Sequence, residues 1–323
     1  MNEILHGDVI EKLKELETGT VQCVVTSPPY WGLRNYQVEK QLGLEKTPEE
    51  YVEKMVEVFR QIKRVLKHDG TVWLNLGDSY NGRSTNRSGQ HGYNDGRSNR
   101  SNRFSVGGIN GLKPKDIVGI PWRVAFALQA DGWYLRQDIV WHKPNPMPES
   151  VQDRCTKSHE FIFLLTKSAR YYYDNDAIAE RATCGESRPD GIARDRMLDY
   201  DSKEKKLRPS KKRGEFGGKW KDMKGQEAFR AVRETRNRRS VWTINTQPYK
   251  EAHFATFPKK LPELCIKAGS KEGDIILDPF FGSGTTGWVA QRLGRQWIGI
   301  ELNEEYIKIA NKRFAQRELF IAK

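Results

Sequence analysis

Residues Ser27 to Trp31 place a serine, two adjacent prolines and two aromatic residues just after the strand-like run VQCVV. Proline has no backbone N–H and a fixed φ, so Pro28 and Pro29 cannot continue a central strand. They predict a rigid, extended segment that points its carbonyl groups in fixed directions. An amino group held there would meet two hydrogen-bond acceptors, the Ser27 Oγ and the Pro28 carbonyl oxygen.

The exocyclic amino group of cytosine or adenine suits this arrangement. Its nitrogen is a poor nucleophile because its lone pair is delocalised into the ring, and two acceptors on its N–H bonds would help to free that pair. Tyr30 and Trp31 offer aromatic surfaces on which a base can stack once it has been extruded from the duplex. Standing alone, the same residues also fit a strand-end turn with buried aromatic rings.

A second group of residues lies near the C-terminus, in DIILDPFFGSGTTGWVAQRLGRQWIGIEL. Its order is strand, Gly-x-Gly turn, helix, strand and acid. Gly282 and Gly284 let the backbone approach a ligand, and the following helix start favours an anionic group. Glu301, about twenty residues on, is placed to bind ribose hydroxyls. The unit lacks the third glycine of the dinucleotide fingerprint and the lysine of a P-loop. It indicates a nucleoside cofactor or, taken alone, a plain tight turn.

Helices and strands alternate along the chain, which is typical of an α/β fold. Thr47, followed by Pro48, predicts the start of a helix with one apolar face, and the sequence HDG at 68–70 predicts its end. Pro121 places the start of a later helix near Ile120. We expect helices within 7–19, 47–68, 120–133, 258–268, 285–294 and 303–319, and strands at 21–27, 71–77, 134–143, 159–168, 274–280 and 296–302.

Positive charge is concentrated in one part of the chain. The formal net charge is +13, and residues 203–239 hold fifteen Lys and Arg against five Asp and Glu. This excess favours a surface that follows phosphates, with a solvated basic linker as the alternative. Residues 81–111, rich in Gly, Ser, Asn and Arg, predict either a loop that orders on nucleic acid or a plain mobile insertion. The candidate DNA-binding residues are Arg83, Arg87, Arg97, Arg100, Arg103, Lys211, Lys212, Arg213, Arg236, Arg238 and Arg239.

Taken together, TSPPYW and DPFFGSGTT resemble motifs of the DNA amino-methyltransferases that use S-adenosylmethionine, in their β-group order. In that family the catalytic motif comes first, the target-recognition region follows, and the cofactor glycine motif comes last. Further similar segments are GD at 7–8, DIVWHKPNPMP, HEFIFLLTKS, and HFATFPKKLPELCIKAGS at 253–270. The resemblance covers roughly two thirds of the chain and leaves out about 180–240.

The resemblance implies a Rossmann-like α/β methyltransferase with a mostly parallel sheet, a permuted motif order and a small basic target-recognition region. Residues 1–179 would form the catalytic half of the core, 180–240 the recognition region, and 241–323 the cofactor-binding half. The methyl group would pass directly to the amine, without a covalent intermediate. The implied catalytic residues are Ser27, Pro28, Pro29 and Tyr30, and the implied residues for S-adenosylmethionine are Asp8, Phe257, Pro258, Asp278, Phe280, Gly282, Ser283, Gly284 and Glu301.

The modified base is predicted from the first residue of the catalytic motif. In this family serine at that position is typical of cytosine-N4 enzymes, whereas aspartate or asparagine is typical of adenine-N6 enzymes. Ser27 therefore favours cytosine, and adenine-N6 methylation is the alternative. Cytosine-C5 chemistry is rejected, because it needs a cysteine nucleophile after a proline and none of the four cysteines follows one.

Functions of other classes fit less well. Pro189-Asp190 with Glu204-Lys205-Lys206 satisfies a loose metal-nuclease pattern, but chance matches are expected in so charged a stretch. A catalytically inactive nucleic-acid-binding module would not need the intact motifs at Ser27 and Gly282. Methyltransferases that act on protein glutamine ordinarily begin this loop with asparagine. An RNA substrate stays open, because both polymers present phosphates.

The expected partner is double-stranded DNA, with a cognate restriction endonuclease and a homodimer left open. No metal site is expected, since Cys155 and His159 supply two ligands where zinc needs more. No apolar stretch approaches the ~18 residues of a membrane span, and the N-terminus has no signal-peptide form. We expect a cytoplasmic protein, prokaryotic or encoded by a phage.

Overall fold

The computed structural model describes residues 2–33, 38–81, 111–181, 235–247 and 258–321. The chain divides into two compact units, one made of Met1–Ala177 with Arg239–Lys323 and the other of Ile178–Arg238. Phe257, Lys211, Lys212, Arg213 and the five candidate arginines between 83 and 103 lie outside the described residues. The roles predicted for them stay predictions.

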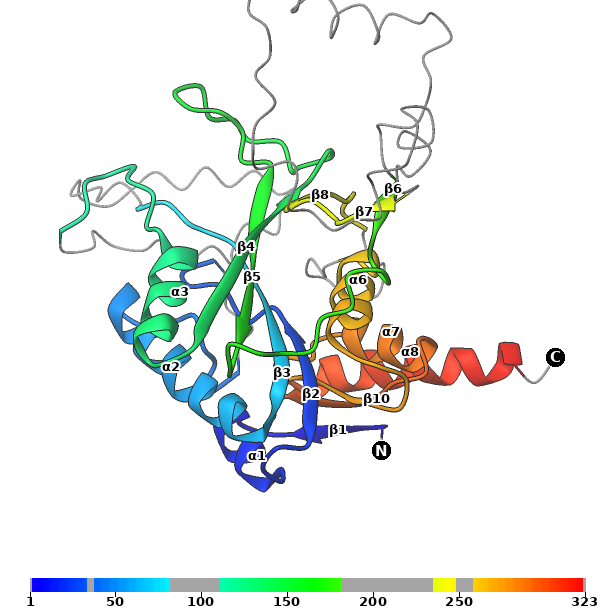
Figure 1. Ribbon diagram of the computed structural model, residues 1–323. Helices are drawn as coiled ribbons and strands as arrows, with labels where there is room; N and C mark the ends of the chain where they lie inside the picture. Colours follow the sequence, from blue (N-terminus) through cyan, green and yellow to red (C-terminus); the bar gives the residue numbers. More distant parts are fainter. Residues whose placement is uncertain (1, 34–37, 82–110, 182–234, 248–257, 322–323) are drawn as a thin grey trace, which may run out of the picture. The chain divides into compact units, whose positions relative to one another are not determined.

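An eight-stranded sheet forms the centre of the larger unit (Figure 1). Five of its strand pairs are parallel, and β5 runs antiparallel to both of its neighbours, β3 and β4. The mostly parallel sheet of the predicted α/β fold is therefore confirmed. In spatial order the strands are β1 (Asn2–His6), β10 (Gln296–Glu301), β9 (Ile275–Asp278), β2 (Val21–Thr26), β3 (Leu66–Leu76), β5 (His159–Thr166), β4 (Tyr134–His142) and β8 (Val241–Thr243).

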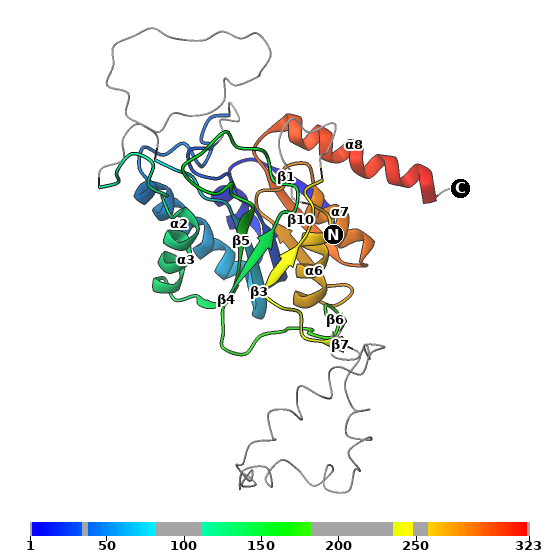
Figure 2. The ribbon, with the colours of Figure 1, turned by 90° about the horizontal axis from the view of Figure 1, so that it is seen from above.

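Helices cover both faces of this sheet. Viewed from above, α2 and α3 lie on one side and α6, α7 and α8 on the other (Figure 2). The main apolar core lies between β2, β3 and the helices α1 to α3. The helices of this unit are α1 (Val9–Glu15), α2 (Pro48–Val65), α3 (Ile120–Ala130), α6 (Lys260–Gly269), α7 (Thr285–Arg292) and α8 (Glu304–Ile321).

The α2 helix begins as its sequence predicts. The Thr47 hydroxyl accepts a hydrogen bond from the Glu50 N–H at 3.2 Å, and Pro48 occupies the first helical position, where it needs no donor. The end differs from the prediction, because the helix stops at Val65 and β3 already starts at Leu66. An irregularity in the β2–β3 register lets Leu66 pair with Val21, so the residues HDG lie inside the strand.

Two strands of the main sheet are not among those predicted from the sequence. β1 has five residues, none of them fully buried, and β8 has three residues, of which Trp242 is buried. Such short, partly exposed strands carry too little apolar alternation to be recognised from sequence. They are nevertheless important for the fold, since β1 pairs with β10 and β8 with β4.

The smaller unit is described at its two ends. There β6 (Glu180–Arg181) and β7 (Thr235–Arg236) pair antiparallel. The Arg236 Nε donates to the Glu180 carboxylate at 2.9 Å, and the Arg238 Nε donates to the Ile178 carbonyl oxygen at 2.8 Å. These two candidate DNA-binding arginines therefore also join the two described ends of the unit. The unit spans 178–238, and a role for it in target recognition stays a prediction.

Candidate active site

The proline segment leaves the sheet where β2 ends at Thr26. Its backbone is fixed by the Tyr51 hydroxyl of α2, which donates to the Pro29 carbonyl oxygen at 2.9 Å. Trp31 is 2% exposed and its indole N–H donates to the Glu45 carbonyl oxygen at 3.0 Å. Trp31 therefore anchors the segment in the core, and of the two rings predicted to stack a base only Tyr30 keeps exposed surface among the described atoms.

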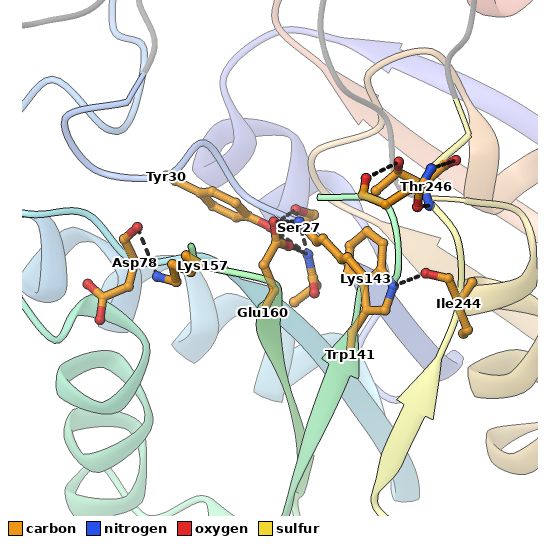
Figure 3. Close-up of polar contacts among 11 residues, drawn as sticks. Ser27, Tyr30, Asp78, Trp141, Lys143, Lys157, Glu160, Ile244 and Thr246 are labelled. Atoms are coloured by element: carbon orange, nitrogen blue, oxygen red, sulfur yellow. Dashed lines mark hydrogen bonds and ion pairs between the residues drawn. The ribbon is translucent and has the colours of Figure 1, made fainter. Parts of the chain in front are cut away.

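Ser27 and Tyr30 belong to a connected set of hydrogen bonds (Figure 3). The Ser27 hydroxyl donates to the Tyr30 hydroxyl oxygen at 3.1 Å, and the Tyr30 hydroxyl donates to Glu160 Oε2 at 2.7 Å. The Asn75 amide donates to Glu160 Oε2 at 2.8 Å, to Ser27 Oγ at 3.4 Å and to the Tyr30 hydroxyl. Ser27 and Tyr30, which the sequence predicts, therefore contact two residues that the sequence does not predict. These are Asn75 on β3 and Glu160 on β5.

Lys143 completes this cluster from the end of β4. Its ammonium group forms an ion pair with Glu160 Oε1 and lies 4.4 Å from the centroid of the Trp141 ring. The Trp141 N–H donates to the Ile244 carbonyl oxygen at 2.8 Å, which ties β4 to the segment after β8. The short strand β8 therefore helps to fix the position of Lys143.

The loop after β3 forms the other side of the cluster. Asp78 Oδ1 accepts from the backbone N–H groups of Gly119 at 3.0 Å and Ile120 at 3.1 Å, which holds the start of α3. The Lys157 ammonium donates to the Asp78 carbonyl oxygen at 3.1 Å, and burial lowers the pKa of Lys157. Gly77 is required here, because a Cβ at this position would lie 2.6 Å from the Tyr30 ring.

Asp278 connects this site to the glycine turn. Its carboxylate accepts from the Thr26 hydroxyl at 2.8 Å, the Thr286 hydroxyl at 2.7 Å and the Phe280 N–H at 3.1 Å. Burial raises the pKa of Asp278 to about 7, despite these donors. Because Thr26 directly precedes Ser27, Asp278 fixes the proline segment relative to the turn at 281–284.

The glycine turn has the geometry that its sequence requires. Gly282 and Gly284 have φ values of 52° and 76°, in the left-handed region that glycine adopts at low cost, and Gly284 is the N-cap of α7. Ser283 is 3% exposed, and its buried hydroxyl has no hydrogen-bond partner within the described part of the chain. A buried polar atom without a partner is costly, so this hydroxyl marks a place for a polar ligand group.

Glu301 closes this side of the site from the end of β10. Its carboxylate accepts from the Gly282 N–H at 2.7 Å and the Asn303 N–H at 2.8 Å, and burial raises its pKa. The Gly7 N–H donates to the Glu301 carbonyl oxygen at 3.1 Å, which brings Asp8 alongside. Asp8 itself caps α1 by accepting from the Ile10 N–H at 2.9 Å.

The structure therefore brings together most of the predicted site. Asp8, Gly282, Ser283, Gly284 and Glu301 lie around one turn, with the Phe280 backbone and Asp278 beneath it. Pro258 is buried beside the start of α6. Asn75 carried a recognisable signal, a polar residue inside the buried strand TVWLNLG. Glu160 and Lys143 carried none, because charged residues at strand ends are common.

Thiol chemistry does not fit this site. Cys23 lies on β2, four residues before Ser27, but burial raises the pKa of its thiol to about 12. Burial likewise raises the pKa of Cys265. A thiol that stays protonated at neutral pH is a weak nucleophile. Among the described residues, no cluster of three or more potential metal ligands occurs, and no helix is long and apolar enough to cross a membrane.

The fold and the site define an α/β protein in which Asp278 links a glycine turn to a segment that carries a serine and a tyrosine. Residues 21–312 match the family described as DNA methylase, and the chain belongs to that family. Relatives match this chain over most of their own length. The Type II methyltransferase M.Cfr9I of Citrobacter freundii is 46% identical over 96% of this chain and 86% of its own, and M.SmaI of Serratia marcescens is 44% identical over 98% and 91%.

Solved structures with the same fold are more distant in sequence. The PvuII DNA methyltransferase, titled cytosine-N4-specific, has a TM-score of 0.62 at 19% identity and covers 97% of this chain and 86% of its own. A putative DNA modification methylase from Thermus thermophilus, solved with S-adenosyl-L-methionine, has a TM-score of 0.58 at 21% identity and covers 98% and 94%. These structures support the methyltransferase fold of this chain.

Proposed function

We propose that the protein transfers the methyl group of S-adenosylmethionine to the N4 amine of a cytosine that has been flipped out of double-stranded DNA. Membership of the DNA methylase family supports methyl transfer to DNA. The observation that carries the choice of an amine is the Ser27 hydroxyl, which donates to Tyr30 and so offers its lone pairs to the base. Serine at this position favours cytosine over adenine.

The cofactor site fits the residues around the glycine turn. The Ser283 hydroxyl and the backbone of Gly282 and Gly284 would hold the amino-acid end, and Glu301 and Asp8 the nucleoside end. When bound, S-adenosylmethionine supplies a methyl group attached to a positively charged sulfur. The carboxyl groups of Asp278 and Glu301, which lie beside Thr26 and the turn, would line this site.

The base would lie between the proline segment and β3. The Tyr30 ring, held against Gly77, supplies a stacking surface, and Ser27 Oγ with the Pro28 carbonyl oxygen accept the two amine hydrogens. Fixed acceptors of this kind orient the nitrogen lone pair without reorganisation during the reaction. The Tyr51 bond to Pro29 keeps these acceptors in place.

The remaining parts of the proposal concern DNA and the cellular setting. The basic residues of 178–238 and the arginines of 83–103 would contact DNA phosphates and the recognised sequence. Since its relatives are Type II methyltransferases, we infer that the protein protects cytoplasmic DNA of a prokaryote against a restriction endonuclease with the same recognition site.

Replacing Ser27 by alanine tests the catalytic assignment. Loss of one fixed acceptor should slow methyl transfer by about 100-fold or more, while cofactor and DNA affinity stay near those of the wild type. Transfer of labelled methyl groups from S-adenosylmethionine to mixed-sequence DNA measures the rate. Ser168→Ala, in the turn after β5 and at the opposite end of the strands from Ser27, is the matched control. Full activity of Ser27→Ala would remove Ser27 from the mechanism.

A further inference from the structure

The hydrogen bonds around Tyr30 have a consequence for the proton that the amine must lose. We propose that this proton is relayed through Ser27 and Tyr30 to Glu160, which is its final acceptor. The inference rests on the proposed function, since it concerns the same amine and the same Ser27. It adds two residues, Glu160 and Lys143, to the catalytic apparatus of the proline segment.

The direction of the hydrogen bonds carries the proposal. The Ser27 hydroxyl donates to Tyr30 at 3.1 Å, and the Tyr30 hydroxyl donates in turn to Glu160 Oε2 at 2.7 Å. Both protons thus already point toward the carboxylate. The Ser27 oxygen keeps a lone pair for the amine, because its own hydrogen is directed away from the base.

Asn75 contacts the members of the proposed relay but is not itself a proton acceptor. It is 2% exposed, and its amide donates to Glu160 Oε2 at 2.8 Å and to Ser27 Oγ at 3.4 Å. An amide holds the three oxygen atoms together but does not titrate near neutral pH. Ser27 and Tyr30 are neutral hydroxyl groups that can pass a proton on, whereas the Glu160 carboxylate is an acceptor, so the proposal ends the chain Ser27–Tyr30–Glu160 there.

Lys143 pairs with the proposed acceptor, Glu160. Its ion pair with Glu160 is largely buried, with side-chain exposures of 18% and 15%. Lys157 and His159 also act electrostatically on Glu160, and the charges of Asp78 and Glu149 act on Lys157. His142 lies beside His159. The ammonium groups of Lys143 and Lys157 thus act on the Glu160 carboxylate, the group that accepts the proton in this proposal.

The atoms and electrons of the step balance. The amine nitrogen forms a bond to the methyl carbon, and the bond from that carbon to sulfur breaks with its electron pair staying on sulfur. The nitrogen, now positively charged, releases one proton to Ser27 Oγ. Ser27 passes its own proton to Tyr30, and Tyr30 passes its own to Glu160. The sulfonium charge and the carboxylate charge are both neutralised, and Glu160 then returns the proton to solvent.

Single-turnover methyl transfer of the full chain, measured against pH, tests this relay. Glu160→Gln keeps a hydrogen-bond acceptor for Tyr30 but removes the proton acceptor. We expect its rate to fall about 100-fold and then to rise with pH, as hydroxide replaces the carboxylate. Glu160→Asp should recover part of the rate. The Glu160→Gln/Lys143→Met double variant, which leaves no unpaired ammonium group, should stay as slow as Glu160→Gln.

Tyr30→Phe provides the second measurement. It keeps the stacking ring and removes the hydroxyl, so a relay predicts the same loss as Glu160→Gln and no further loss when the two are combined. S-adenosylmethionine affinity and thermal melting of each variant report on folding. A wild-type rate and pH profile in Glu160→Gln would overturn the relay. Losses of rate that multiply when Tyr30→Phe and Glu160→Gln are combined would also overturn it. Absence of methylation by the wild-type protein would instead overturn the proposed function itself.

Discussion

Asp278 is the residue whose ionisation the fold opposes most clearly. Its pKa rises from 3.8 to about 7 because the carboxyl group is buried, so the native state keeps a proton that the unfolded chain has released. Its contribution to the free energy of unfolding is therefore largest below about pH 4 and falls as pH rises toward 7. At neutral pH the cost is on the order of a few kcal/mol.

Asp278→Asn should remove this pH dependence. The amide keeps an oxygen for the Phe280 N–H, and the Thr26 and Thr286 hydroxyls can rotate to meet the new donor. Urea unfolding without cofactor at pH 5 and pH 8 measures the effect, and the variant should gain stability relative to wild type as pH increases. An equal change in the free energy of unfolding with pH in both proteins would show that Asp278 is not the titrating group.

Candidate site residues could be predicted where local sequence marks them. The pair of prolines after a strand marked Ser27 and Tyr30, and the glycine turn marked Gly282 and Gly284. Glu160 could not be assigned in the same way, because its role arises from the pairing of β5 with β3 and from partners 85 to 130 positions away. No short-range pattern encodes such a pairing.

At the scale of elements, the junction after β3 sets the position of the Tyr30 ring, which we propose stacks on the base. Gly77→Ala would place a methyl group 2.6 Å from Tyr30 Cε2, so the ring must move. We expect methyl transfer to slow at least tenfold while S-adenosylmethionine affinity is unchanged, because the glycine turn is untouched. Stopped-flow rates and calorimetric titration measure the two quantities. Unchanged rates would mean that the Tyr30 position is not critical.

Elements were predicted in proportion to their length and burial. The long amphipathic helix α2 and the buried strands β2 and β9 stand out in the sequence. β8, with three residues, does not, although it pairs with β4 beside Lys143. The start of β3 was also misplaced, because the sequence HDG is typical of a turn while the register irregularity with β2 accommodates it in a strand.

The whole molecule carries its charge unevenly, and this predicts how it binds DNA. Replacing Lys211, Lys212 and Arg213 together by alanine should weaken DNA binding and reduce the salt dependence of the affinity. The slope should fall by about one unit for each phosphate that the variant no longer neutralises. Fluorescence anisotropy across a salt series measures the slope.

A matched control removes the same charge elsewhere. Lys54, Lys260 and Lys308 each form an ion pair with a glutamate of the larger unit. The variant with alanine at all three positions should therefore leave the salt dependence of DNA affinity nearly unchanged. Equal effects of the two triple variants would show that net charge, not the basic segment, governs DNA binding.

The most direct measurement identifies the methylated base. The protein is incubated with S-adenosylmethionine and mixed-sequence DNA, which is then digested to nucleosides and examined by mass spectrometry. The Ser27 assignment predicts N4-methyldeoxycytidine in the wild-type reaction and its loss with Ser27→Ala. N6-methyldeoxyadenosine without N4-methyldeoxycytidine would contradict the choice of cytosine, and the absence of both from a protein that binds the cofactor would contradict the function itself.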